Sequence, residues 1–205
     1  MITAHLPKAV KVLADELAEL PSIGPRQAIR LAIYLVNAGQ NKIRTLAQNI
    51  DDLKNTKLCE RCFFIHQNKD SLCDICKDPS RRKDIIAVVE KETDLISIEN
   101  TKKFVGRYVV LGDIPKAGLL EDWQKLRLQN LKSFIEKELS TQGGATEIII
   151  ALNPTSIGDF HASMISKELG SYAKKISRLG RGLPTGGEIE FADSETLGSA
   201  LERRS

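Results

Sequence analysis

Hydrophobic residues recur every three or four positions through the first part of the chain. This spacing predicts amphipathic helices over residues 8–20, 25–36 and 42–53. Pro25 marks the start of the second helix, because proline at the first helical position forgoes no intrahelical hydrogen bond. In that helix the positions predicted to face inward are Ala28, Leu31, Ala32, Leu35 and Val36. The beginning of the chain is therefore predicted to be an all-helical module.

The hydrophobic pattern changes character in the middle of the chain. Residues 85–89, 108–111 and 148–152 form continuous apolar runs, which are typical of strands buried on both faces of a parallel sheet. Residues 92–99 and 121–139, which lie between these runs, have helical spacing. Strands that alternate with helices predict an α/β layer with right-handed crossovers.

The last part of the chain combines short apolar stretches with a glycine-rich turn. The pattern predicts a helix near residues 160–169, a strand over 175–178, a turn over 180–187 and a short strand over 188–191. A last helix is predicted from Asp193 onward. The C-terminus is thus expected to be a strand-helix tail.

These segments predict a multidomain α and α/β protein. We expect a helical module over residues 1–55, a small cysteine-containing module over 56–80, an α/β domain with a parallel sheet over 81–170 and the tail over 171–205. The cysteine-containing module has no hydrophobic run long enough to form a core. Something other than apolar packing must therefore hold it together.

Composition and charge narrow the class of protein. A hydrophobic content of 41% and a charged content of 28% are ordinary for a globular chain, and no apolar run is long enough to cross a bilayer. Residues 1–7 lack the basic stretch and the apolar run of a secretory signal, so we expect a cytoplasmic protein with no membrane role. The net charge of +3 does not by itself indicate DNA binding, because a firm grip on DNA needs several cations on one surface. Local clustering or self-assembly has to supply them.

Four cysteines form the most specific pattern in the chain. They make two Cys-x-x-Cys pairs, Cys59 with Cys62 and Cys73 with Cys76, separated by ten residues. Two such pairs place four thiolates at the corners of a tetrahedron, which is the geometry of a closed structural Zn²⁺ site. Zinc binding worth about 10–16 kcal/mol orders a segment this poor in hydrophobic residues. Two disulfides or four separate thiols are the alternatives, and a reducing compartment disfavours the disulfides.

Residues 20–28 join two apolar helices through a tight turn and resemble the helix-hairpin-helix of DNA-repair proteins. A helix that begins after Gly24 directs free backbone N–H groups and its positive dipole end at one spot, where a phosphate binds without base readout. Arg26 and Arg30 lie one helical turn apart and extend that contact to neighbouring phosphates. The alternative is an ordinary helical hairpin whose two arginines are only solvated.

Glu90 directly follows the first predicted strand, and residues 153–159 follow the third. Together they resemble the Toprim fold of topoisomerases and primases. In the catalytic members, the resemblance implies, a glutamate and an Asp-x-Asp pair hold Mg²⁺. Here Asn153 and Thr155 replace that pair, while Glu90 and Asp159 remain. Two dispersed carboxylates are a poor substitute for a charged cluster, so Mg²⁺-dependent phosphoryl chemistry is not expected.

Glu90 and Asp159 keep more than one interpretation. They are candidates for a weak Mg²⁺ site or for contacts to a partner protein. Glu90 has the further alternative of a carboxylate at the sheet edge that binds the N-terminus of a nearby helix.

The order of these features, together with residues 178–193 of the tail, resembles the bacterial recombination-mediator family RecR. The resemblance covers essentially the whole chain, and the tail and the zinc-ribbon segment are its most specific parts. It implies a homodimer or a ring-like homotetramer that holds single- and double-stranded DNA. It also implies partnership with RecO and RecF in loading recombinase onto single strands, with Arg26 and Arg30 at the DNA-binding positions of the family.

The sequence departs from the family pattern at three places. Ser22 stands where the hairpin usually has a glycine, which tolerates a tight turn more easily than serine does. Ile157 and Asp159 replace glutamates of the usual Glu-Gly-Glu stretch, and the loop over residues 112–118 is shorter than usual. Recognition of RecO is the property that these changes would alter, while the fold is expected to survive them.

Three functions compete on these observations. The favoured one is a non-enzymatic DNA clamp and recombination mediator. A Mg²⁺-dependent Toprim nuclease or primase would use Glu90 and Asp159, and the missing aspartates argue against it. A zinc-ribbon scaffold for proteins or RNA would not need Arg26 and Arg30, whereas a clamp would lose DNA affinity without them.

Overall fold

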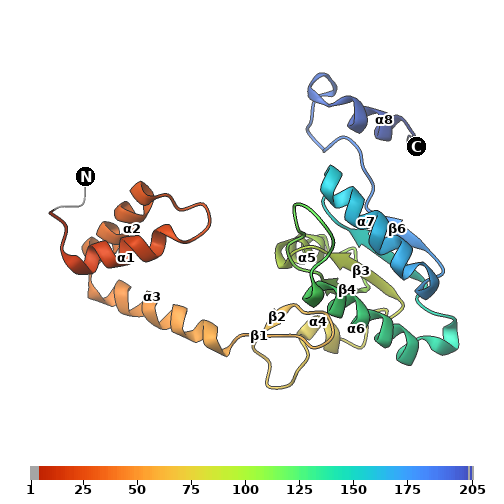
Figure 1. Ribbon diagram of the computed structural model, residues 1–205, viewed down its shortest axis with the longest axis horizontal. Coiled ribbons are helices and arrows are strands. Elements are labelled where there is room, and N and C mark those ends of the chain that lie inside the picture. Colours follow the sequence, from red (N-terminus) through yellow and green to blue (C-terminus); the bar gives the residue numbers. More distant parts are fainter. Residues whose placement is uncertain (1–4, 203, 205) are drawn as a thin grey trace. The chain divides into compact units, whose positions relative to one another are not determined.

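The computed structural model describes residues 5–202 and residue 204 (Figure 1). The chain divides into two compact units, Met1–Thr56 and Lys57–Ser205. Residues 1–4, on which the expectation of no secretory signal partly rests, lie outside the described residues. Among the described helices, none joins the length and the apolar character that a membrane crossing requires.

The first unit is built on a close contact between two helices, α1 (Lys8–Ala18) and α2 (Pro25–Ala38). Ala14, Ala28 and Ala32 are buried in this contact, because small side chains let two helix backbones approach each other. As predicted, α2 begins at its proline. The helical pair that the sequence predicted is therefore present, joined by a tight turn.

Two details of this pair differ from the prediction. α1 ends at Ala18 and does not reach residue 20. The prediction that Val36 faces inward is wrong, since its side chain is exposed. Val36 lies in the last turn of α2, beyond the buried residues Ala28 and Ala32 through which α2 packs against α1.

The third helix, α3 (Gln40–Asp52), follows after Gly39 and carries the predicted apolar stripe. The larger apolar side chains of α3 are all exposed: Ile43, Leu46 and Ile50. Leu53, which directly follows the helix, is exposed as well. Apolar side chains gathered on one helix face usually mark a surface that another element or molecule covers. The described part of the chain does not cover them.

The second unit begins with a segment of little regular structure. β1 (Lys57–Leu58) and β2 (Ile65–His66) pair in antiparallel fashion, and α4 (Asp74–Lys77) is a single short helix. The buried side chains of this segment are the four cysteines, and the residues packed against them are Phe64, Leu72 and Ile75. The cysteines thus stand where a larger domain has its hydrophobic core.

A parallel sheet of four strands forms the centre of the second unit (Figure 1). The strands are β3 (Ile85–Val89), β4 (Arg107–Val110), β5 (Glu147–Ala151) and β6 (Ile176–Arg178), in the spatial order β4-β3-β5-β6. The continuous apolar runs are therefore the buried parallel strands that the sequence predicted. Their carboxyl ends lie at one edge of the sheet, where Glu90 and Asn153 follow β3 and β5.

Helices cover both faces of this sheet. Consecutive strand residues point to opposite faces, so Val88 and Val89 belong to two different cores. The core around Val88 is closed by α6 (Asp122–Glu138) and α7 (Ser156–Leu169). The core around Val89 is closed by α5 (Glu92–Asn100). This layering is the α/β architecture expected from the alternation of runs and helical stretches.

The tail corrects one prediction. The segment predicted as a strand over 188–191 is a 3-10 helix, η4 (Ile189–Phe191), followed by α8 (Ser194–Glu202). The alternation Glu-Ile-Glu-Phe suits a strand, but this segment pairs with no strand of the described chain, and the Phe191 N–H instead donates to the carbonyl of Glu188. The other 3-10 helices are η1 (Leu53–Asn55), η2 (Ser140–Gln142) and η3 (Gly170–Tyr172).

Candidate metal centre and nucleic-acid interface

The turn between α1 and α2 exposes the beginning of α2. Ser22 has a φ of 67°, in the left-handed region, and the Ile23 N–H donates to the carbonyl of Leu20 at 3.1 Å. Gly24 is the N-cap residue of α2 and no side chain caps it. The first N–H groups of α2 therefore point away from the helix without an intrahelical acceptor, which is the arrangement that binds a phosphate.

Arg26 and Arg30 lie at this same end of α2. Both side chains are exposed, and they stand one turn apart on the helix. Within the described residues, neither guanidinium forms an ion pair or a hydrogen bond to another side chain. The structure thus brings together Gly24, Arg26 and Arg30, with both cations free to meet an external anion.

The four predicted metal ligands converge in the second unit. Cys59, Cys62, Cys73 and Cys76 are all buried, none is in a disulfide, and their sulfur atoms lie within 4.8 Å of one another. The Sγ atoms of Cys62 and Cys73 are 3.4 Å apart. Tetrahedral zinc with Zn–S bonds of about 2.3 Å sets its sulfurs roughly 3.8 Å apart, so the donor set fits a single metal ion.

Crowding of the four sulfurs affects their protonation. Contact with Cys59, followed by contacts with the other two cysteines, raises the pKa of the Cys62 thiol far above its ordinary value. Two adjacent thiolates in a buried site repel each other, so one of them retains its proton. A divalent cation between the sulfurs reverses this balance, because it stabilises the thiolate form of each ligand.

Hydrogen bonds hold the first cysteine pair in a tight turn and join it to the sheet. The Phe63 N–H donates to the Cys59 carbonyl at 2.9 Å, and Phe63 itself has a φ of 63°. The Val110 N–H donates to the Cys62 carbonyl at 2.8 Å, so the cysteine segment continues the edge of β4. The ring of Phe63 lies 4.9 Å from the guanidinium of Arg127 on α6. The metal-ligand loop is thus part of the packing of the sheet domain.

Glu90 is held by the residue that stands in place of a catalytic aspartate. The Asn153 amide donates to Glu90 Oε2 at 2.9 Å, and the Ile114 N–H donates to Oε1 at 3.4 Å. Among the described residues, Glu90 thus binds an amide and a loop N–H, and no hydrogen bond joins it to a helix N-terminus. At the start of α5, which follows Glu90 in the chain, the Lys91 N–H donates to the carboxylate of Asp94 at 2.9 Å.

Asp159 faces the tail. Its Oδ1 atom accepts a hydrogen bond from Arg178 at 2.5 Å and another from Arg181. The guanidinium of Arg178 lowers the pKa of Asp159 below its ordinary value, and Arg181 adds to this effect. Asp159 and Glu90 therefore have different partners, and the two carboxylates share no group of three or more acidic, cysteine or histidine ligands in the described chain.

Thr155 and Gly158 explain why the chain turns as it does after β5. The Thr155 hydroxyl oxygen accepts a hydrogen bond from the Gly158 N–H at 3.1 Å and so caps α7. A Cβ at position 158 would lie 2.0 Å from the carbonyl oxygen of Asn153, so this position requires glycine. The residues at the aspartate positions of catalytic Toprim proteins thus have structural partners here.

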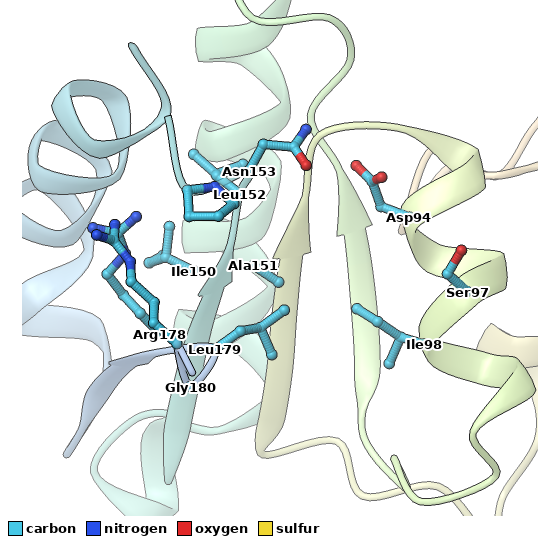
Figure 2. A pocket seen from close by; sticks show the side chains of 12 residues that line it. Asp94, Ser97, Ile98, Ile150, Ala151, Leu152, Asn153, Arg178, Leu179 and Gly180 are labelled. Carbon is cyan, nitrogen blue, oxygen red and sulfur yellow. The ribbon is translucent and has the colours of Figure 1, made fainter. Parts of the chain in front are cut away.

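A cavity of about 280 Å³ lies beside this turn (Figure 2). Figure 2 shows Asp94 and Ser97 on its α5 side and Arg178 and Leu179 on its β6 side, with Asn153 at the end of β5. The lining therefore mixes one carboxylate with arginine and apolar side chains. Such a lining does not form the acidic cluster that Mg²⁺ binding requires.

Comparison with known families covers almost the entire chain. The family described as "RecR, helix-hairpin-helix" matches residues 10–54, the family "Toprim domain" matches residues 84–180, and "RecR, C-terminal" matches residues 182–205. A protein of Frankia alni called "Recombination protein RecR" is 38% identical over 198 residues, which is 95% of each chain. Proteins of the same name from Chloroflexus aggregans and Roseiflexus castenholzii are 42% and 40% identical, over 94% and 97% of this chain and 91% and 94% of theirs.

The chain belongs to the RecR family. The family predicted from the order of motifs is therefore confirmed, together with the mixed helical and α/β fold. The RecR C-terminal match begins directly after Arg181, the residue through which the tail contacts Asp159. The tail that made the sequence recognisable is thus tied to the sheet domain by ion pairs.

Sequence reasoning missed the roles of Arg178 and Arg181 in this RecR chain. Both lie within residues 178–193 of the tail, but no local pattern pairs them with an aspartate 19 and 22 residues earlier. Arg107, the first residue of β4, was missed as well, and it donates from Nη1 to the carbonyl of Cys76 at 2.9 Å. An arginine at the start of a predicted buried strand is the one signal that would have singled it out.

Proposed function

We propose that this protein is a recombination mediator in DNA repair, which holds DNA and partner proteins and does not itself catalyse a reaction. The observation that carries the proposal is the uncapped start of α2 at Gly24, flanked by two exposed and unpaired arginines, in a chain of the RecR family. The relatives are named recombination proteins, so we expect this chain to act in recombination as well.

The proposed contact is to the DNA backbone. The first N–H groups of α2 and the guanidinium groups of Arg26 and Arg30 bind phosphates, which are alike in every sequence. We therefore expect binding to single- and double-stranded DNA with no base preference. The strength of such binding falls steeply with salt, because each phosphate contact releases condensed counterions.

Self-assembly supplies the further cations that one chain lacks. With a net charge of +3, one copy has a weak field, whereas a homodimer or homotetramer presents two or four arginine pairs to the same DNA. The exposed apolar side chains on α3 support this step, since Ile50 and Leu53 are 60% and 65% exposed in a single chain. A second copy of the chain is the proposed occupant of that face.

The proposed metal at the four cysteines is Zn²⁺ with a structural role. Four thiolates complete its tetrahedral shell, so no position is open to a water or a substrate. Mg²⁺ has no part in the proposed function, because Glu90 binds Asn153 and Asp159 binds two arginines. Glu90 and Asp159 remain candidates for contacts to RecO and RecF, the partners that family membership leads us to propose in the cytoplasm.

The test replaces both hairpin arginines and follows duplex affinity against salt. Losing two phosphate contacts per engaged chain is expected to reduce the slope of log K against log salt by about 1.8, since each contact contributes roughly 0.9. Affinity for duplexes of different sequence should fall by the same factor. A matched control, Lys8→Ala with Lys11→Ala, removes the same charge from exposed positions at the other end of the helical pair and should change the slope little. Wild-type affinity of the Arg26→Ala, Arg30→Ala variant at every salt concentration would rule the proposal out.

Gly24→Ala separates the backbone contact from the charge. A Cβ at this position meets nothing within 4 Å in the chain, so the fold should tolerate it. A phosphate seated against the first N–H groups of α2 would meet the added methyl group, so affinity should fall with no change in net charge. Unchanged affinity would place the phosphate elsewhere on the unit.

A further inference from the structure

Arg107 is a buried cation with no carboxylate partner. Arg107 is the first residue of the edge strand β4, yet it is only 4% exposed. Nη1 donates to the carbonyl oxygen of Cys76 at 2.9 Å, while the Nε atom is buried with no hydrogen-bond partner among the described residues. A buried charge is strongly unfavourable unless an opposite charge compensates it. The compensating charge therefore has to be identified.

The acidic side chains in the neighbourhood are engaged elsewhere. Glu138 binds Lys83 at 3.3 Å, and Asp78 accepts a hydrogen bond from the Ser80 hydroxyl at 2.6 Å. Arg61 lines the same small cavity as Arg107 and lies over the ring of Phe134, 5.1 Å from its centre. The described chain thus places a second guanidinium near Arg107 and no carboxylate in contact with either.

The cavity between the two arginines is too small for an external oxyanion. Its volume is about 10 Å³, which suffices for one water molecule at most. A phosphate from solution or from DNA does not fit there. The negative charge has to come from the protein itself, and the cysteine cluster, whose Cys76 carbonyl binds Arg107, is a source that no salt bridge of the described residues already engages.

Four thiolates around a divalent cation leave an excess of two negative charges. Arg61 lies inside the first cysteine pair, between Cys59 and Cys62, and Arg107 binds the backbone of Cys76 in the second pair. Arg61 and Arg107 are thus attached to different cysteine pairs, and both line one small cavity. Their number matches the excess charge of a metal held by four thiolates.

We propose that Arg107, assisted by Arg61, is a positioning residue of the metal centre: its charge neutralises the tetrathiolate, and its hydrogen bond fixes the second cysteine pair. This inference rests on the metal site proposed above. It explains why a charged arginine is buried at this place, and it makes the metal affinity depend on two residues that are not ligands.

The test measures metal affinity in the full chain with Co²⁺ and Zn²⁺ as probes. Cobalt held by four thiolates has charge-transfer and d–d absorption bands that report the ligand set, and competition with a chelator gives the affinity for each metal. Arg107→Gln keeps a donor for the Cys76 carbonyl and removes the charge, and Arg107→Lys keeps the charge. We expect affinity to fall about 10–100-fold in the Gln variant and to be largely retained in the Lys variant.

Lys132→Gln is the control. Lys132 is a partly buried cation on α6 that binds Glu168 at 2.7 Å and lies 5.7 Å from the centre of the Tyr172 ring, and neither partner belongs to the cysteine segment. Its replacement should leave the metal affinity unchanged. If Arg107→Gln does not fold, Arg61→Gln decides the matter, because Arg61 is partly exposed and its loss should still weaken binding.

Three results would overturn the inference. Two of them concern the role of Arg107, and the third concerns the metal site itself. Unchanged metal affinity in Arg107→Gln would show that the charge of Arg107 does not stabilise the site. If Arg107→Gln does not fold, unchanged metal affinity in Arg61→Gln would overturn the inference instead. An equal loss in Arg107→Gln and Arg107→Lys assigns the effect to packing. A wild-type chain that gives no cobalt-thiolate bands refutes the metal site itself, and the inference falls with it.

Discussion

Ser22 adopts a backbone conformation that residues other than glycine rarely adopt. Its φ of 67° places it in the left-handed region, where a Cβ approaches the following carbonyl oxygen. The comparison with the family hairpin had already indicated that a glycine is usual at this position. The structure supplies the reason, because the turn between α1 and α2 needs a positive φ whichever residue occupies it.

Ser22→Gly is expected to stabilise the helical unit. Relief of the left-handed strain contributes about 1–2 kcal/mol, and the greater freedom of glycine in the unfolded chain offsets part of it, so a net gain of roughly 0.5–1 kcal/mol should appear. Denaturation followed by circular dichroism measures it. Ser22→Ala retains a Cβ and should show no gain. Equal stability of all three proteins would mean that the turn carries no strain.

Asn153 and Thr155 show how residues at former aspartate positions acquire other partners. Asn153 donates to Glu90, and Thr155 caps α7. From the sequence, the loss of the acidic pair was evident. That the surviving acids, Glu90 and Asp159, would be engaged by an amide and by two arginines was not, because these partners are far away along the chain.

At the scale of elements, hydrogen bonds link the cysteine segment to strand β4 of the sheet. The Val110 N–H donates to the Cys62 carbonyl, and Arg107 binds the carbonyl of Cys76. Both β4 residues are thus bonded to the cysteine loops, which the proposed metal would order. The module boundaries predicted at residues 55, 80 and 170 stay predictions, and β6, which follows the last of them, completes the sheet.

Removal of the metal is therefore expected to loosen the outer edge of the sheet as well as the cysteine loops. Amide hydrogen exchange in the presence of a strong chelator should accelerate at Val110 and in residues 57–77, while the central strands β3 and β5 stay protected. Exchange in α2, which belongs to the other compact unit, serves as the internal control. If exchange accelerates only in the cysteine loops, the hydrogen bonds between these loops and β4 do not depend on the metal.

At the scale of the whole molecule, charge and exposed apolar surface lead to the same expectation. A single chain of net charge +3 is expected to hold DNA weakly. The apolar side chains of Ile43, Leu46, Ile50 and Leu53, on α3 and directly after it, are exposed. Burying that face against a second copy removes apolar surface from water and multiplies the hairpin arginines.

Light scattering with and without duplex DNA measures this assembly. The wild-type chain is expected to have a mass that is a multiple of one chain, and Ile50→Glu should shift it toward the monomer, because a carboxylate in an apolar contact is strongly unfavourable. Thr45→Glu places the same charge on another side of α3 and should leave the mass unchanged. A wild-type monomer that ignores DNA would contradict the proposed clamp.

The sequence by itself determined the local elements and the cysteines that form the cluster. The helices follow from apolar spacing and from Pro25, the strands from continuous apolar runs, and the cysteine cluster from its two pairs. These features depend on neighbours a few residues away, so a linear pattern contains them. The order of the motifs further sufficed to recognise the family.

Only the tertiary structure decided which distant residues meet. The tail reaches Asp159 through Arg178 and Arg181, Arg107 is buried beside Cys76, and the stripe on α3 stays uncovered. Residues 188–191 have the alternation of a strand but lack a neighbouring strand to bind, and so they form a 3-10 turn. Each of these outcomes depends on contacts across the fold, where burial and the available partners decide, and no local pattern of residues encodes them.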